Sequence, residues 1–305
     1  MSLIGVTPAL QTGVVRAADA GKGDAPRRQV GHPALRCGAM RERSRRRQPL
    51  PGPFPFLDHP WPIAFAHRGG AAGGLENSMV AFAHAVDLGY RYLETDVHAT
   101  ADGVLLAFHD RTLDRVTDRV GVVSRLPWAL VSQARIGGRE PIPTLEELLG
   151  AWPEVRVNID VKGVGAIAPL VRAVRRTGAL DRVCVASFSA RRLSAVRRAL
   201  GPQLCTALTP AGAGLLRVAA AHRLAQGLVP RQVPCAQVPD RVGRLPIVTA
   251  GVVELAHRHG LRVHVWTVDA AEEIERLLDL GVDGIMTDQV LTLRTALLRR
   301  GMWQM

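Results

Sequence analysis

IAFAHRGGAAGGLENSMVAFAHAVDLGYRYLETDVHATADGVLLAFHD, residues 63–110, is the stretch that decides the fold. Its first apolar run, 63–66, breaks off at His67, as a buried strand does when it delivers polar groups to its C-terminal end. A glycine-rich turn and an Asn-Ser cap lead to a helix over 78–88, and a second strand follows over 91–98. This order of strand, helix and strand predicts a parallel sheet with helical crossovers.

Titratable side chains gather near the ends of these strands. Glu94 and Asp96 stand two residues apart, so their side chains point to one face of the second strand. The next apolar run, 104–108, ends in His109 and Asp110. Two histidines suit general acid and base chemistry, paired carboxylates suit Mg²⁺ or Ca²⁺, and the arginine after the first histidine suits a phosphate. Each feature alone is also typical of a barrel rim or a solvated strand face, and their combination indicates a site.

The stretch resembles the glycerophosphodiester phosphodiesterase family, whose pattern runs HRG, then a Pro-Glu-Asn helix start, then Glu-x-Asp, then His-Asp. This sequence has HRGG, LEN, ETD and FHD in the same order and at similar spacing. Leu75 stands where the family has a proline, which removes little beyond the stiffness of that turn. Further matches extend the resemblance from about residue 62 to the C-terminus.

Alternating strand and helix patterns predict a TIM (β/α)8 barrel over residues 61–305. The predicted core strands are 62–67, 91–98, 154–162, 182–187, 203–208, 235–239, 262–268 and 283–287. The predicted helices are 78–88, 144–152, 165–177, 190–200, 211–226, 248–259, 270–280 and 289–299. Residues 103–143 break the alternation and form an insertion after the second barrel strand, where it would shape the mouth of a site. In the resembled family an insertion here is associated with recognition of the glycerol-containing substrate.

The predicted strand over 154–162, EVRVNIDVK, carries a second polar cluster. Its valines and isoleucine fall on one face, whereas Asn158, Asp160 and Lys162 fall on the other. Three polar groups on one face of a barrel strand are costly unless they serve a site. The family usually has Asn-x-Glu-x-Lys here, so Asp160 keeps the charge on a side chain one methylene shorter. Lys162 is one of only two lysines among the 39 basic residues.

The resemblance implies roles for these residues. Glu94, Asp96 and Asp160 would bind Mg²⁺ or Ca²⁺, and His67 and His109 would be the general acid and base. The implied phosphate and substrate contacts are Arg68, Glu76, Lys162 and Trp266. The implied reaction is metal-dependent hydrolysis of a glycerophosphodiester to glycerol 3-phosphate and an alcohol.

Matches near the C-terminus are less specific. Trp266 resembles a pocket position at the end of a predicted strand, and Thr287-Asp288 belong to a closing signature that we interpret as a structural turn. Three further histidines look superficially like metal ligands: His257, His259 and His264. The first two lie in the last turn of a predicted helix, where the helix dipole favours them.

The composition permits a large apolar core, and the excess positive charge is densest in the first 60 residues. Apolar residues make up 47% of the 305, and the formal net charge is +12. Residues 1–60 hold ten Lys/Arg against four Asp/Glu, and residues 61–305 hold twenty-nine against twenty-three. We predict that 1–60 is a basic, disordered tail, because it lacks periodicity and ends in a proline-rich lead-in. Its arginine-rich run, 41–47, also suits nucleic acid or an anionic membrane, and Met40 would open a shorter chain.

The expected cellular compartment is inferred from the apolar runs, the N-terminus and the spacing of the cysteines. No apolar run reaches the ~18 residues of a membrane span, and the N-terminus lacks the pattern of a signal peptide. The four cysteines have no CxxC spacing: Cys37, Cys184, Cys205 and Cys235. Three of them lie in strand-like runs, so we expect buried free thiols in a cytoplasmic protein.

Two alternatives remain open on the sequence. A related phospholipase-type phosphodiesterase, acting on phosphoinositides or sphingomyelin, would use the same paired histidines. A non-catalytic barrel would bind anions or nucleic acid through its arginines, but such a protein should have lost one of the histidines or acids. We expect a small-molecule substrate and no nucleic-acid partner. The head group, the oligomeric state and the nucleophile (water or the glycerol hydroxyl) do not follow from the sequence.

Overall fold

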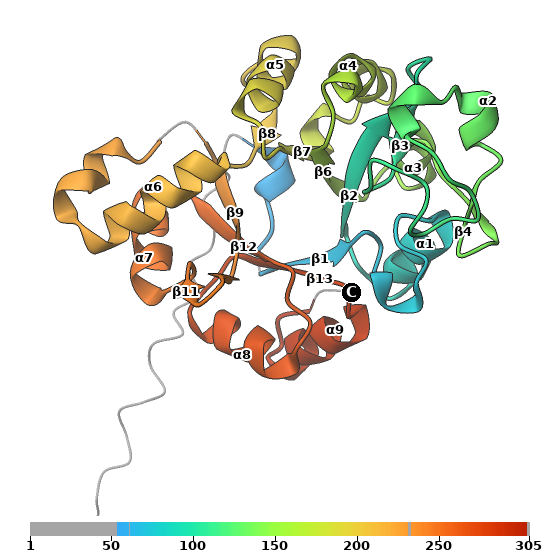
Figure 1. Cartoon of the computed structure of the whole chain (residues 1–305). Coiled ribbons are helices and arrows are strands. Elements are labelled where there is room, and N and C mark those ends of the chain that lie inside the picture. Colours follow the sequence, from blue (N-terminus) through green and yellow to red (C-terminus); the bar gives the residue numbers. More distant parts are fainter. Residues whose placement is uncertain (1–53, 61, 231–232, 304–305) are drawn as a thin grey trace, which may run out of the picture. The chain divides into compact units, whose positions relative to one another are not determined.

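The computed structural model describes residues 54–60, 62–230 and 233–303, so most of the predicted tail lies outside the described residues. Eight parallel strands form the barrel (Figure 1). They are β1 (Ile63–His67), β2 (Tyr92–Ala99), β6 (Arg156–Val161), β7 (Val183–Ala186), β8 (Cys205–Thr206), β9 (Cys235–Pro239), β12 (Arg262–Trp266) and β13 (Gly284–Thr287). Their order is β8-β7-β6-β2-β1-β13-β12-β9, and a parallel bridge between Ala207 and Cys235 joins the two outer strands. The predicted (β/α)8 barrel is confirmed.

Helices surround the strands and follow the predicted ranges within a few residues. They are α1 (Met79–Asp87), α3 (Leu145–Ala151), α4 (Ile167–Arg176), α5 (Ala190–Leu200), α6 (Pro210–Ala221), α7 (Ala250–Arg258), α8 (Ala271–Asp279) and α9 (Val290–Arg299). The predicted helix over 211–226 is shorter, because the chain leaves α6 at Ala221 and continues as the 3-10 helix η6 (Arg223–Leu228). Ser78 caps α1 by accepting a hydrogen bond from the backbone N–H of Ala81.

The segment after β2 forms a small subdomain with its own apolar core. Its elements are β3 (Leu105–Ala107), η3 (Val123–Arg125), α2 (Trp128–Val131), β4 (Arg135–Ile136) and β5 (Glu140–Pro141). β3 pairs antiparallel with β2. Phe108, Leu113 and Ile136 are buried together beneath it. Residues 109 and 110 therefore follow a strand that is held by its pairing with β2 and by the packing of this core, and not a free loop.

The N-terminal end of the barrel is closed by η1 (Pro55–Leu57). Phe56 is fully buried against Phe65 and Tyr92, and the Tyr92 hydroxyl donates to the Phe56 carbonyl over 2.8 Å. The packing of the barrel thus begins before residue 61.

Short elements complete the connections: η2 (Ala71–Gly73), η4 (Val164–Ala166), η5 (Leu180–Arg182) and the hairpin β10 (Arg241–Val242) with β11 (Leu245–Pro246). None of the helices in the described residues has both the length and the apolar character needed to cross a bilayer.

Candidate active site

The turn after β1 folds back over the ends of the neighbouring strands. Arg68, Gly69 and Gly70 all have positive φ, at 52°, 82° and 91°. A Cβ at Gly69 would lie 2.9 Å from the backbone nitrogen of Phe82, so only glycine lets the turn pack on α1. The backbone N–H of Arg68 donates to Glu94 Oε2 over 3.2 Å, which fixes the turn on β2.

The strand register brings the predicted acids together. His67 lies beside Glu94, and Asp96 lies beside Asp160 on the next strand. These three carboxyl side chains belong to buried residues that are 4%, 2% and 7% exposed. Lys162 joins two of them, because its Nζ lies 2.8 Å from Asp96 Oδ1 and 2.8 Å from Asp160 Oδ2.

Burial and mutual repulsion make it costly to charge all three carboxyl groups of this cluster at once. Burial, and then the charge of Asp96, raise the pKa of Glu94 to about 8. Burial also raises the pKa of Asp160, although Lys162 opposes it. Among the described residues, buried Asp96 Oδ2 and Asp160 Oδ1 accept no hydrogen bond, although Arg68 Nε lies 3.2 Å from Asp96 Oδ2 as an ion-pair partner. A set of converging carboxylate oxygens fits a hard divalent cation, and Glu94, Asp96 and Asp160 are the residues that would hold it.

His67 is held by a carboxylate that the sequence interpretation missed. Its Nδ1 lies 2.7 Å from Asp288 Oδ1, and its Nε2 lies 3.7 Å from Glu94 Oε2. Burial acts to lower the pKa of His67, but Glu94 and Asp288 together raise it above the ordinary value. Asp288 does lie in the bend that ends the last barrel strand, as interpreted from the sequence, and it also holds His67, which that interpretation did not include. Asp269 supports this contact by accepting the backbone N–H of Asp288 over 2.8 Å.

His109 has a matching partner in the insertion. Its Nδ1 lies 2.6 Å from Asp110 Oδ1. Arg115 donates from Nε to Asp110 Oδ2 over 2.6 Å and grips Glu76 over 2.7 and 2.9 Å. The Arg115 guanidinium lowers the pKa of Asp110 to about 2, so this partner of His109 is charged at neutral pH.

Glu76 plays a different part from the other predicted residues. It sits between two guanidiniums, with Arg68 Nη1 at 2.9 Å and Arg115 on its other side. Burial acts to raise the pKa of Glu76, but the two arginines lower it. Arg68 Nε also lies 3.2 Å from Asp96 Oδ2, so this arginine spans Glu76 and the carboxylate cluster.

A cavity of about 660 Å³ at the C-terminal ends of the strands contains the site. Every predicted site residue except Glu76 lines it: His67, Arg68, Glu94, Asp96, His109, Asp160, Lys162 and Trp266. Its floor includes Gln237, whose Nε2 donates to Asn158 Oδ1 over 2.8 Å. Much of the remaining lining is apolar, with Phe188, Leu208, Val218, Val238, Leu245 and Ile247. Gln237 is a single polar residue in the apolar strand CAQVP, and this break in the apolar pattern is the sequence signal that marks it.

Comparisons with known proteins agree with this arrangement. Residues 67–292 match the model of the glycerophosphoryl diester phosphodiesterase family. The chain is 44% identical over 255 residues to a probable glycerophosphodiester phosphodiesterase 2 of Mycobacterium tuberculosis, covering 81% of this chain and 95% of that protein.

Solved structures show the same fold. A putative glycerophosphoryl diester phosphodiesterase from Silicibacter pomeroyi matches with a TM-score of 0.68 at 25% identity, over 82% of this chain and 100% of that one. An Oleispira antarctica phosphodiesterase, in complex with the product sn-glycerol-3-phosphate, matches with a TM-score of 0.66 at 21% identity, over 78% and 97%. With the family model spanning both histidines and all three acids, this chain belongs to the glycerophosphoryl diester phosphodiesterase family and is a phosphodiester hydrolase.

Proposed function

We propose that this chain hydrolyses glycerophosphodiesters to glycerol 3-phosphate and an alcohol, with a divalent cation at Glu94, Asp96 and Asp160. One observation carries the proposal: two histidine–carboxylate pairs lie at one cavity with a buried cluster of three carboxyl groups. A non-catalytic barrel would not be expected to keep such a cluster, because each buried charge costs stability unless it serves a ligand.

The two histidines divide the proton transfers. His67, held at Nδ1 by Asp288, acts as the general acid and donates a proton to the oxygen of the leaving alcohol. His109 accepts the proton of the nucleophile that attacks phosphorus, which is either water or the glycerol hydroxyl. Asp110 stabilises the imidazolium that results. Both imidazoles are fixed at Nδ1 by a carboxylate, which leaves Nε2 of each ring for the substrate.

The bound cation would neutralise the phosphate and stabilise the charge of the transition state. It would compete with Lys162 and Arg68 for the same carboxylates, and so leave these two positive charges for the phosphate oxygens. Lys162 Nζ also lies 5.6 Å from the centre of the Phe188 ring, and both residues line the cavity.

The test uses the full chain with glycerophosphocholine and measures glycerol 3-phosphate. Turnover should stop in excess chelator and return with Mg²⁺, Mn²⁺ or Ca²⁺. His67→Ala and His109→Ala should each reduce kcat by roughly 10² to 10⁴, whereas His84→Ala, on the exposed face of α1, should not. Full turnover in chelator would remove the cation from the proposal, and ordinary kcat in folded variants of both histidines would remove the acid–base assignment.

A second candidate substrate class is a lysophospholipid, in which the glycerol carries an acyl chain. The apolar lining favours it, and three apolar side chains at the mouth are more than half exposed: Phe188, Val242 and Leu245 at 61%, 61% and 53%. Exposed apolar groups around a cavity are typical of a surface that receives an apolar ligand.

Choline release from lysophosphatidylcholine and from glycerophosphocholine separates the two classes. If the acyl chain lies on this lining, Leu245→Asp should lower kcat/KM for lysophosphatidylcholine at least tenfold and leave glycerophosphocholine within about twofold. Equal effects of Leu245→Asp on both substrates would exclude the acyl-chain subsite.

A further inference from the structure

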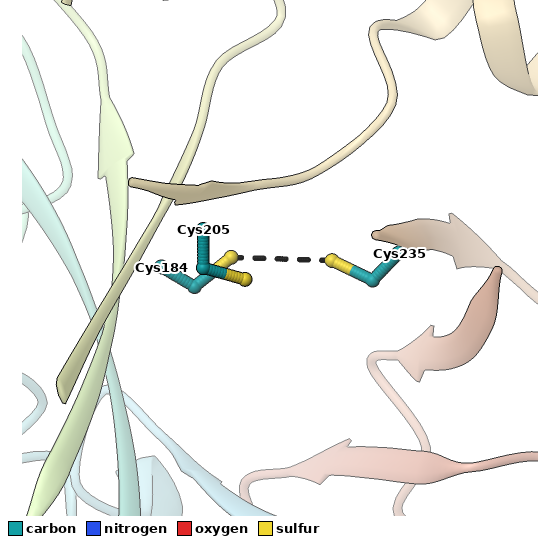
Figure 2. Close-up of side chains that lie close together, drawn as sticks. All are labelled: Cys184, Cys205 and Cys235. Carbon is teal, nitrogen blue, oxygen red and sulfur yellow. Dashed lines mark hydrogen bonds between the residues drawn. The ribbon is translucent and has the colours of Figure 1, made fainter. Parts of the chain in front are cut away.

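Three cysteine thiols meet inside the barrel, beneath the floor of the active-site cavity. Cys184, Cys205 and Cys235 come from β7, β8 and β9, and all three are free and at most 1% exposed. Their Sγ atoms lie within 4.8 Å of one another, and Cys184 Sγ lies 3.9 Å from Cys235 Sγ (Figure 2). The predicted burial of these thiols is confirmed.

The spacing of the sulfurs fits one tetrahedral metal ion. With Zn–S bonds of about 2.3 Å, two sulfurs of a tetrahedral site stand roughly 3.8 Å apart. The 3.9 Å between Cys184 and Cys235 is already close to that separation. Figure 2 shows the three side chains directed toward a common point from separate strands. Small rotations about the Cα–Cβ bonds would bring Cys205 to the same separation.

The strand beside β9 carries a buried histidine that lies outside the 4.8 Å cluster of the three sulfurs and interacts with Cys235. His264 on β12 is fully buried, and its Nε2 has no hydrogen-bond partner among the described residues. An unsatisfied buried imidazole nitrogen is costly, and it needs an explanation. Its Nδ1 lies 3.4 Å from Gln237 Nε2, and Gln237 Nε2 in turn lies 4.0 Å from Cys184 Sγ. Turning the amide groups of both Gln237 and Asn158 would keep their 2.8 Å hydrogen bond, with Asn158 as the donor. Gln237 Oε1 would then accept the Nδ1 proton of His264 and leave Nε2 for ligation.

The surrounding charge also suits a thiolate site. The neighbouring thiols of Cys184 and Cys205, and then the imidazole of His264, lower the pKa of Cys235 well below its usual value, while burial raises the pKa of the other two. The guanidinium of Arg197 acts on all three sulfurs and is held on Thr206 Oγ1 over 2.8 and 2.6 Å. Three thiolates, one neutral imidazole and Zn²⁺ leave one negative charge, which Arg197 would balance.

We propose that Cys184, Cys205, Cys235 and His264 bind one Zn²⁺ ion in the interior of the barrel. The ligand set is soft and closed, unlike the hard carboxylate oxygens of the active site, so the two sites select different metals. Because the ligands are buried, the ion enters while the chain folds, and its binding energy adds to the stability of the barrel. The three cysteine thiols have to lose their protons before they bind zinc as thiolates, so zinc binding releases protons.

The test starts with the full chain produced in zinc-supplemented medium and dialysed against a chelator, which strips cations from the carboxylate cluster. Elemental analysis should then find one zinc per chain. Cys205→Ala and Cys235→Ala should retain less than a tenth of an equivalent, and Cys37→Ala, the matched control, should retain it all. His264→Gln should weaken zinc binding at least tenfold.

Refolding with Co²⁺ provides a second, spectroscopic readout. A thiolate site gives a sulfur-to-cobalt charge-transfer band, which oxygen ligands cannot produce, and Asp96→Asn should keep this band. A zinc-free chain with no thiolate–cobalt band would overturn the proposal, as would a folded Cys205→Ala that still holds one zinc. Unchanged zinc affinity in His264→Gln would overturn the four-ligand site.

Discussion

Asp288→Asn tests the most specific feature of the proposed site, in which His67, the proposed general acid, is held by a carboxylate from the far end of the chain. The substitution keeps the shape of the side chain and removes its charge. We expect kcat to fall while KM stays within about twofold, because Asp288 touches His67 and does not line the cavity. The alkaline limb of the pH–rate profile should move to lower pH, because Asp288 helps to raise the pKa of His67.

The size of the loss follows from the contact. A hydrogen bond to a charged group is worth about 1.5 to 3 kcal/mol. The His67–Asp288 distance is 2.7 Å, and the two side chains are 14% and 28% exposed, so solvent screens the pair only in part. At 1.36 kcal/mol for each factor of ten, the expected loss in kcat is roughly 10- to 150-fold.

Single-turnover rates and circular dichroism on the same samples give the measurement. Asp283→Asn is the matched control, because Asp283 forms another short histidine pair, 2.7 Å from His257, and lies outside the cavity. That control should lose stability and keep its kcat. A folded Asp288→Asn enzyme with normal kcat and an unmoved alkaline limb would show that His67 needs no carboxylate, and would refute the reasoning.

Three further outcomes are expected. Lys162→Arg should lower kcat/KM more than tenfold in a folded enzyme, since a planar guanidinium cannot replace an ammonium placed 2.8 Å from both Asp96 and Asp160; unchanged kinetics would take Lys162 off the site. Cation affinity, measured by competition with a chelator, should weaken about tenfold per pH unit below pH 8 and be flat above it, because Glu94 must lose a proton to bind; a flat profile from pH 6 to 8 would contradict this. A chain beginning at Pro51 should keep kcat/KM within about twofold, and a tenfold loss would give the tail a catalytic role.

The same Glu94 carboxyl fixes the sign of the stability change. Its pKa in the folded protein, about 8, lies above its ordinary value of 4.5, so protons favour the folded state. In the cation-free protein, the contribution of Glu94 to the free energy of unfolding should therefore be fully present below pH 4.5. This contribution should be lost as the pH rises through about 8. A bound cation should stabilise the protein most at the alkaline end, which thermal unfolding with and without Mg²⁺ would measure.

Local patterns were enough to predict the barrel. Each core strand is an apolar run that ends in polar residues, and each helix has a cap or an amphipathic period, so strand and helix ranges followed from neighbours in sequence. The acids of β2 and β6 followed in the same way, because alternation along a strand places them on one face.

Contacts between distant segments did not follow from the sequence. Asp288 lies 221 residues from His67, and only closure of β13 on β1 brings them together. Arg115 lies in the irregular insertion, where no periodicity indicates which way a side chain points. The cysteines of β7, β8 and β9 lack motif spacing, because barrel curvature and not sequence separation makes them neighbours.

The seam between β8 and β9 gives the barrel uneven stiffness. β2 and β6 are paired without interruption from Tyr92 to Val97, beneath the charged groups, whereas β8 is two residues long and meets β9 at a single bridge. The apolar lining of the cavity lies along this seam, with Leu208 on one side and Val238 on the other. In the zinc-free chain we therefore expect a bulky ligand to spread this sparsely paired seam before it disturbs the spacing of the carboxylates, whereas the proposed zinc ion would tie β8 to β9. The continuously paired strands β2 and β6 would then set the geometry of the reaction, and the seam between β8 and β9 would set the range of ligand shapes that the cavity admits.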